Sequence, residues 1–205
     1  MEQLTRKDRE DRRKKYDIIY VAVSEFSSKG FYGTTMADIS KSSEFPLATI
    51  YRLFESKEQI YFELLDKKAR ELIFSIENTI QNSIQGTVHK LKNGLCAYCN
   101  FCIENREFTK IYLEERQRLD RILNPDHKNH ILLMIKNVFL LFEKVFQEGI
   151  DKDEFKPYSS KEMGILFVGM ITSVLSNWVI YQTSDEDLKS KFDMGFEIFT
   201  QGIFR

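Results

Sequence analysis

Proline and glycine, the residues that most often interrupt helices, are scarce in this sequence. It contains three prolines and nine glycines in 205 residues, and few stretches alternate β-branched and polar residues as half-buried strands do. Scarce proline and glycine permit long helices, and the scarcity of alternating stretches excludes a sheet-rich chain. We therefore expect an all-α protein.

The chain also lacks an excess of either charge. Lys and Arg together number 30, Asp and Glu number 31, and the formal net charge is −1. Proteins that bind any polyanion carry a large basic excess, so this class is excluded. Binding to nucleic acid would have to rest on a local surface with specific contacts.

Signals for export, disulfide cross-linking and catalysis are missing as well. The first residues, Met1–Lys7, contain neither the apolar core nor the cleavage site of a secretory signal. The three cysteines are an odd number and lie close together, so they do not form a disulfide framework. The sequence contains no HExxH, GxSxG, P-loop or dinucleotide motif. We expect a cytoplasmic protein that is not an enzyme and holds no cofactor.

Three cysteines and two histidines leave a metal or redox site open as a minor alternative. Cys96, Cys99 and Cys102 have the spacing of iron–sulfur proteins, but the fourth cysteine of such a site is missing. At helical spacing they are more typical of small core residues than of a redox sensor. His127 and His130 lie about one turn apart and could bind a metal ion, although surface positions are the simpler interpretation. We expect no metal site.

One stretch is long and apolar enough to raise the question of a membrane. Residues 163–181 contain no charged side chain and are close to the ~20 residues that a spanning helix needs. The stretch also contains Thr172, Ser173, Ser176 and Asn177 and has no strong basic cluster at either end. A helix buried between the core and a dimer partner explains it better, so we expect no membrane partner.

Start and stop signals divide the chain into helices. A first helix is expected at Arg12–Lys29 and stops at Gly30. A short helix begins at Thr35 with a capping box and ends before Pro46, which opens a second short helix. The next helix begins at Ser56. Longer amphipathic helices are expected at residues 59–85, 88–105, 107–123, 127–149, 160–183 and 186–204.

A long helix followed by two short ones and a tight turn is typical of a helix-turn-helix unit, whose second short helix enters the major groove of DNA. The segments Phe31–Ile39 and Thr49–Glu58 stand in the order and spacing of the tetracycline-repressor (TetR) family, which the sequence closely resembles from about Arg12 to Leu65. We therefore predict a DNA-binding domain at residues 1–58, with residues 1–11 as a flexible segment, and a helical ligand-binding and dimerisation domain at residues 59–205.

The resemblance implies the DNA contacts. Phosphates would be bound by Thr35, Tyr51 and Lys57. Base edges would be read by Leu47, Ala48, Thr49 and Arg52, of which Arg52 alone can make a bidentate contact with guanine. The basic run at residues 6–15 is interpreted as a solvated helix extension rather than a minor-groove arm.

The turn departs from the family pattern. Glu44 stands where glycine is usual, and Phe45 and Pro46 follow it. A non-glycine residue in the left-handed region costs on the order of 1 kcal/mol. The turn and the register of the base contacts are therefore the points at which this chain can differ from the family.

Dimerisation and effector binding are expected of the remaining helices. Because one recognition helix reads few bases, such proteins bind as dimers to half-sites ~34 Å apart. The dimer interface is expected to include Ile171, Val174, Leu175, Trp178, Phe192, Phe196 and Phe199. The ligand pocket is expected to include Tyr98, Cys102, Phe108, Tyr112, Arg116, Phe139, Phe142 and Asn177.

These expectations define a homodimeric transcriptional repressor. A small hydrophobic effector would release it from a palindromic operator by favouring a conformation with misaligned recognition helices. The alternative is a helical interaction or ligand-binding protein of the same fold with weak or lost DNA binding. Steep salt dependence of binding to random DNA would distinguish the two.

Overall fold

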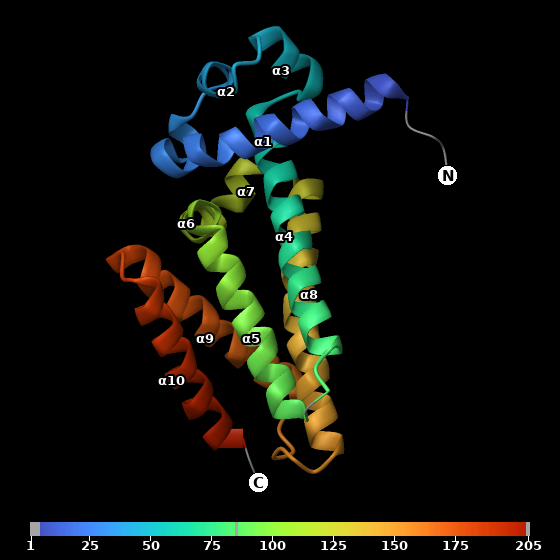
Figure 1. Ribbon diagram of the computed structural model, residues 1–205, viewed down its shortest axis with the longest axis vertical. Helices are drawn as coiled ribbons and strands as arrows, with labels where there is room; N and C mark the ends of the chain where they lie inside the picture. Colours follow the sequence, from blue (N-terminus) through green and yellow to red (C-terminus); the bar gives the residue numbers. More distant parts are fainter. Residues whose placement is uncertain (1–4, 85, 204–205) are drawn as a thin grey trace. The chain divides into compact units, whose positions relative to one another are not determined.

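The computed structural model describes residues 5–84 and 86–203, and every regular element in these ranges is a helix. The all-α prediction is confirmed. The chain forms two compact units (Figure 1). Unit 1 contains the described residues up to Lys68 together with Arg106–Asn129, and unit 2 contains Ala69–Asn105 and the residues from His130 onward. Residues 106–129 thus group with the N-terminal helices in unit 1.

Helix α1 of unit 1, Arg6–Gly33, begins earlier than the expected Arg12. The side chain of Thr5 accepts a hydrogen bond from the backbone N–H of Asp8, whose carboxylate bonds back to Thr5, and this capping box fixes the start. Residues 6–11 are therefore helical, whereas residues 1–4 of the expected flexible segment lie outside the described residues. Near its other end, Gly30 has φ 72°, which interrupts the helix where we expected it to stop.

The two expected short helices are α2, Met36–Ser43, and α3, Leu47–Leu53. Thr35 caps α2 through the predicted capping box with Asp38. Both helices pack on α1, and α4, Lys57–Gln81, follows them. The core of unit 1 is apolar and consists of Ile18, Ala22, Phe26, Phe31, Ile39, Ile50, Phe54, Ile60 and Tyr61.

The helix expected at residues 107–123 is broken into three pieces. They are α6, Arg106–Glu115, the short 3-10 helix η1, Arg116–Arg118, and α7, Leu119–Ile122. Arg118 leaves helical geometry with φ −112° and ψ 7°, and Leu119 and Ile122 are buried after it. Helix α6 packs on α1. The break in residues 106–122 therefore allows the apolar side chains of α7 to be buried.

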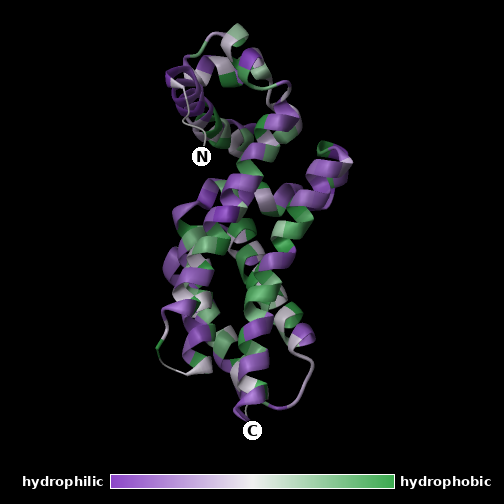
Figure 2. Cartoon of the chain, turned by 90° about the vertical axis from the view of Figure 1, so that its right-hand side faces the viewer, coloured by the Kyte–Doolittle hydropathy of each residue, from purple (hydrophilic) through white to green (hydrophobic). Residues whose placement is uncertain are grey.

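Unit 2 is built on aromatic residues. It contains α5, Thr87–Glu104, α9, Ser160–Tyr181, α10, Asp185–Ile203, and most of α8, Pro125–Asp151. Helix α10 packs on α9 and α5. Hydrophobic and hydrophilic residues alternate along the helices of the chain (Figure 2). The largest fully buried side chains of unit 2 are Phe142, Phe146, Phe155, Phe167 and Trp178.

Helix α9 is the described helix that is long and apolar enough to cross a membrane by length and composition. A core helix of a folded domain meets the same test, and Phe167, Ile171 and Trp178 of α9 are fully buried in unit 2. The burial supports the interpretation of α9 as a core helix.

Candidate DNA-binding surface and effector pocket

The turn between α2 and α3 forms without glycine. Glu44 ends α2 in the left-handed region, with φ 59° and ψ 13°. The hydroxyl of Ser40 donates to the carbonyl of Phe45 at 2.8 Å, and the carbonyl of Pro46 accepts the backbone N–H of Thr49 at 2.7 Å. These bonds close the turn and start α3 at the residue after Pro46.

Helix α3 divides into a buried and an exposed side. Ile50 is fully buried and Leu53 is 8% exposed. Leu47, Ala48, Tyr51 and Arg52 are exposed, and Thr49 is half-buried. Leu47 and Tyr51 are therefore exposed on a short helix that follows a tight turn. A recognition helix reaches base edges and phosphates in this arrangement.

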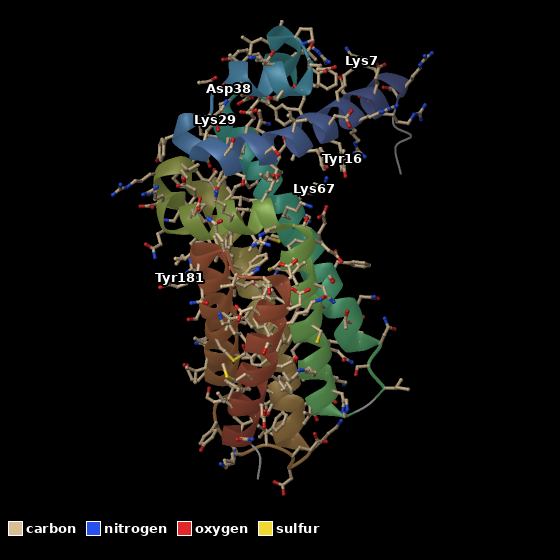
Figure 3. The ribbon with its side chains drawn as sticks, turned by 60° about the vertical axis from the view of Figure 1, so that its left-hand side comes forward. Lys7, Tyr16, Lys29, Asp38, Lys67 and Tyr181 are labelled. Carbon is tan, nitrogen blue, oxygen red and sulfur yellow. The ribbon has the colours of Figure 1, made fainter. Side chains whose placement is uncertain are left out.

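The N-terminus of α2, where Thr35 was expected to bind phosphate, already carries a carboxylate. Asp38 accepts hydrogen bonds from the hydroxyl and backbone N–H of Thr35, and Lys29 lies 2.7 Å from it (Figure 3). The hydrogen bond from Lys29, followed by those from Thr35, holds the pKa of Asp38 far below its usual range. Lys29 also lies 2.8 Å from Glu25, so a phosphate at this end of α2 would compete with two carboxylates for this cation.

Lys57 is largely engaged inside unit 1. Its ammonium donates to the carbonyl oxygens of Phe31 and Thr34, both at 2.7 Å, and lies 4.4 Å from the centre of the Phe31 ring. An ammonium has three N–H donors, and two of them hold the end of α1 to the start of α4. A phosphate contact from Lys57 would use the third.

Arg52 is bound to α1. Its Nη1 and Nη2 atoms each donate to one carboxylate oxygen of Asp11, both at 2.8 Å. Asp11 was not predicted, because no local pattern links two positions that are 41 residues apart. The residue expected to read guanine therefore has its guanidinium occupied in this structure.

The α1 extension is basic and solvated. Residues 6–15 include seven basic and three acidic side chains, and residues 6–10 are exposed. Lys15 is 2.9 Å from Glu63 and lies over the Phe54 ring, which attaches the last turn of this segment to the rest of unit 1. The remaining bases give unit 1 a local positive surface on a chain of near-zero net charge.

The eight residues expected to line the ligand pocket fall into both units. Phe108, Tyr112 and Arg116 belong to unit 1, where the Phe108 and Tyr112 rings stack at 6.3 Å. The other five belong to unit 2. Of these, Tyr98, Cys102 and Phe142 are buried, and Phe139 is half-buried. Asn177 accepts a hydrogen bond from Lys191 at 2.8 Å, which ties α9 to α10.

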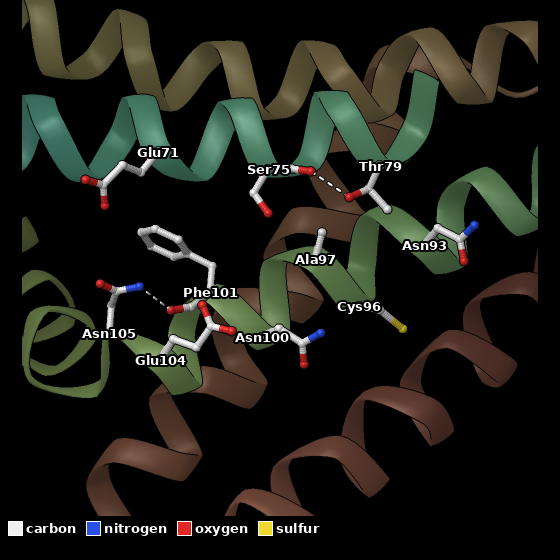
Figure 4. A pocket seen from close by; sticks show the side chains of 10 residues that line it. All are labelled: Glu71, Ser75, Thr79, Asn93, Cys96, Ala97, Asn100, Phe101, Glu104 and Asn105. Atoms are coloured by element: carbon white, nitrogen blue, oxygen red, sulfur yellow. Dashed lines mark hydrogen bonds between the residues drawn. The ribbon is translucent and has the colours of Figure 1, made fainter. Parts of the chain in front are cut away.

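Unit 2 contains a pocket of about 480 Å³ between α4 and α5 (Figure 4). None of the eight expected residues lines it. Its walls are mostly polar and consist of Glu71, Ser75, Thr79, Asn93, Cys96, Ala97, Asn100, Phe101, Glu104 and Asn105. The sequence did not indicate this site, because hydroxyls and amides spaced along two amphipathic helices look like ordinary solvated positions.

The residues expected at the dimer interface mainly face the core of unit 2. Ile171, Leu175, Trp178 and Phe192 are at most 3% exposed. Val174, Phe196 and Phe199 are half-buried, and the Phe199 ring lies 5.1 Å from that of Phe167. The apolar residues that α9 and α10 do expose are Ile165, Leu166, Ile180, Tyr181, Met194 and Ile198.

Two of the three cysteines are buried, and His127 packs on an aromatic ring. Cys99 and Cys102 are buried and Cys96 is exposed, all as free thiols. Burial raises the pKa of Cys99 to about 11, which keeps it a thiol at neutral pH. The His127 ring stacks on Phe62 at 3.8 Å. Within the described part of the chain, no cluster of His, Cys, Asp and Glu could hold a metal ion.

The geometry of α1, α2 and α3 defines a helix-turn-helix DNA-binding protein. A family model described as bacterial regulatory proteins, tetR family, matches residues 18–64. The chain is also similar to YfiR, an uncharacterized HTH-type transcriptional regulator of Bacillus subtilis. The two are 26% identical over 188 residues, which cover 89% of this chain and 87% of YfiR.

Solved structures share the fold over nearly the whole chain. The fatty acid degradation regulator FadR from Bacillus halodurans has a TM-score of 0.81 at 20% identity and covers 92% of this chain and 95% of its own. FadR from Bacillus subtilis, in complex with stearoyl-CoA, has a TM-score of 0.80 at 21% identity, with 91% and 98% covered. Residues 18–64 of this chain therefore form a DNA-binding domain of the TetR type, and the chain is a DNA-binding transcriptional regulator.

Proposed function

We propose that the protein is a homodimeric repressor that binds a palindromic operator through the exposed side of α3 and is released by a hydrophobic effector. The observation that carries the proposal is the exposed face of α3, held by a turn whose backbone hydrogen bonds are satisfied. Relatives of similar sequence include KstR2 of Mycolicibacterium smegmatis, named as a transcriptional repressor. We propose a cytoplasmic protein without enzymatic activity.

A palindromic operator requires a second recognition helix and therefore a dimer. We assign the dimer surface to the exposed apolar residues of α9 and α10, above all Leu166, Ile180 and Ile198, which are 65–69% exposed. Apolar side chains gathered on two adjacent helices are costly in water and are covered in a helix-bundle dimer. The predicted residues Ile171, Trp178 and Phe192 would support this surface from inside the protomer.

The dimer is tested with Ile198→Asp, which places a charge on that surface. Sedimentation velocity should show a dimer for the wild type and a monomer for the variant. Phe74→Asp is the control, because Phe74 is 70% exposed on α4, outside α9 and α10, and it should remain dimeric. A wild type that stays monomeric at high concentration would contradict the assignment.

The effector is proposed to act on α4. This helix starts directly after the helix-turn-helix unit and lines the pocket with Glu71, Ser75 and Thr79. A ligand that prefers one position of α4 shifts operator affinity by its differential affinity for the two conformations. The solved FadR structure with stearoyl-CoA suggests an acyl compound as the first effector to try. The polar lining would suit the polar part of such a molecule.

The effector proposal is tested by adding stearoyl-CoA to the protein bound to its operator. We expect release of the DNA, and we expect Ala97→Phe, which fills the pocket, to remain bound at the same ligand concentration. Equal release from both proteins would place the effector elsewhere. Binding of the ligand without release would contradict its role in regulation.

DNA binding itself is tested by selection from a pool of random duplexes. A palindrome should be enriched, and its affinity should fall steeply with salt because Lys and Arg displace counterions from phosphates. If no duplex is enriched, the alternative of an interaction or ligand-binding protein that has lost DNA binding replaces the repressor.

A further inference from the structure

We propose that Asp11 masks Arg52, so that this carboxylate competes with DNA for the guanidinium on the recognition helix. The inference rests on the proposed function, since it concerns how α3 meets DNA. Both Nη atoms of Arg52 donate to Asp11, one to each oxygen and both at 2.8 Å. The two end-on donors of the guanidinium are therefore used by one acceptor group, while its Nε–H and the outer N–H of each Nη are not part of this pair.

The same pair of N–H donors is what guanine would need. The O6 and N7 atoms of guanine accept two parallel hydrogen bonds from an arginine, in the geometry that a carboxylate also accepts. One pair of donors cannot serve both acceptors at once. To read a guanine end-on through these two donors, Arg52 must first leave Asp11.

The ion pair is accessible enough for such an exchange. The side chains of Arg52 and Asp11 are 46% and 25% exposed, and ion pairs at a protein surface are weak. Asp11 is the first half-buried residue of α1. It therefore lies where the solvated extension meets α3, beside the bases that would attract the DNA backbone.

The negative charge on Asp11 also acts on the DNA phosphates directly. The hydrogen bond from Arg52 lowers the pKa of Asp11, so the carboxylate is ionised at neutral pH. An ionised carboxylate repels phosphates, and Arg52 cancels that repulsion only while the pair is intact. When Arg52 turns to DNA, the repulsion from Asp11 returns, so the carboxylate opposes binding at each stage.

A purely structural pair would have the opposite effect. If Asp11 only holds α1 against α3, its removal loosens the recognition helix and weakens binding to every duplex. If it masks Arg52, its removal strengthens binding. The sign of the change therefore separates the two roles.

The experiment measures dissociation constants of the full chain for a random-sequence duplex and for the duplex enriched by selection. The variants are Asp11→Ala, Arg52→Ala and the double variant. The matched control is Asp17→Ala, which removes the same charge from an exposed position of the same helix without an Arg52 contact. We expect Asp11→Ala to bind the random duplex roughly threefold to tenfold more tightly than Asp17→Ala. In the Arg52→Ala background the part of this advantage that comes from unmasking should disappear, and only the part that comes from repulsion between Asp11 and phosphates should remain.

A repeat of the selection with Asp11→Ala should strengthen a guanine in each half-site, and Arg52→Ala should lose it. Equal affinities of Asp11→Ala and Asp17→Ala, or weaker binding by Asp11→Ala than by the wild type, overturn the masking role while DNA binding stands. If neither the wild type nor Asp11→Ala binds any duplex, the proposed function fails and the masking role fails with it. Binding by Asp11→Ala alone would support masking directly.

Discussion

The two units use their large side chains in opposite ways. In unit 1 the informative residues of α3, among them Leu47 and Tyr51, are exposed, as their place in the motif predicts. In unit 2 the residues that look most like an interface, such as Trp178 and Phe192, are buried in the protomer itself. Hydrophobicity alone does not say which side of a helix is available to a partner. A motif with fixed spacing does.

The two units are held together by the same kinds of contact. Ion pairs join separate helices in both: Lys29 lies 2.7 Å from Asp38 in unit 1, and Lys90 lies 2.8 Å from Glu148 in unit 2. Packed rings do so as well, since Tyr61 lies 5.1 Å from Phe31 in unit 1 and Phe167 lies 5.0 Å from Phe142 in unit 2. The units therefore differ in which apolar side chains they expose and not in the type of contact between their helices.

The largest effect is expected from a core aromatic of unit 2. Phe167→Ala should lower the free energy of unfolding by about 3–5 kcal/mol, because it leaves a cavity among buried rings. Phe74→Ala, at a side chain that is 70% exposed in the same unit, should change it by less than about 0.5 kcal/mol. Urea unfolding followed by circular dichroism measures both, and similar losses would mean that burial does not distinguish these positions.

A smaller loss is expected at Gly149 in α8. A Cβ atom there would lie 2.2 Å from the Phe155 ring, so Gly149→Ala forces a fully buried ring to move and should cost about 1–3 kcal/mol. At Gly202 in α10 an added Cβ would meet nothing within 4 Å. Gly202→Ala should therefore leave the urea midpoint unchanged or raise it. If Gly202→Ala lowered the midpoint and Gly149→Ala did not, the packing of α8 against Phe155 would be contradicted.

Two left-handed residues allow a direct comparison between the units. Glu44 in unit 1 has φ 59°, and Gln182 in unit 2 has φ 50°. Replacing either by glycine relieves backbone strain and should stabilise the chain by up to about 1 kcal/mol in thermal unfolding. Only Glu44→Gly should also change DNA affinity, since Glu44 lies in the turn before α3. A change in affinity for Gln182→Gly would indicate coupling from unit 2.

The smallest effect concerns a polar atom in the core of unit 1. Tyr61 is fully buried, and its hydroxyl has no hydrogen-bond partner among the described residues. Tyr61→Phe should therefore be neutral or stabilising by up to about 1 kcal/mol. Tyr20→Phe, at a side chain that is 71% exposed, should have no effect. A clear loss of stability in Tyr61→Phe at neutral pH would reveal a partner for the hydroxyl.

The alkaline behaviour of Tyr61 provides a second readout. Burial, and then the charge of Glu115, raises the pKa of Tyr61 above that of a free tyrosine. Since the folded state favours the protonated phenol, this residue's contribution to stability is present below the unfolded pKa of about 10 and is lost as pH rises above it. Tyr61→Phe should lack that loss. Equal alkaline transitions for wild type and variant would contradict the raised pKa.

Local signals in the sequence predicted most of the fold. The capping box of Thr35 and Asp38 gave the start of α2, and Pro46 gave the start of α3, because both act within a few residues. The break between α6 and α7 was missed. Its apolar residues keep helical spacing through the break, and the turn at Arg118 depends on packing with other helices.

The candidate sites were predicted unevenly for the same reason. The exposed side of α3 follows from its motif, whereas the pairing of Arg52 with Asp11 depends on the tertiary path of α1. Helix α9 is apolar on nearly all sides, so its pattern could not show that Ile171 faces inward and Leu166 outward. The pocket between α4 and α5 was missed because its lining consists of common polar residues.

The contact between DNA and the exposed side of α3 is tested by placing one negative charge on that side. Ala48→Glu should weaken binding to the selected duplex by more than roughly tenfold through repulsion by phosphates. Gln117→Glu adds the same charge to the exposed helix η1 of the same unit and should change binding by less than about twofold. Equal effects of the two substitutions, with unfolding midpoints unchanged, would contradict the assignment of α3 as the recognition helix.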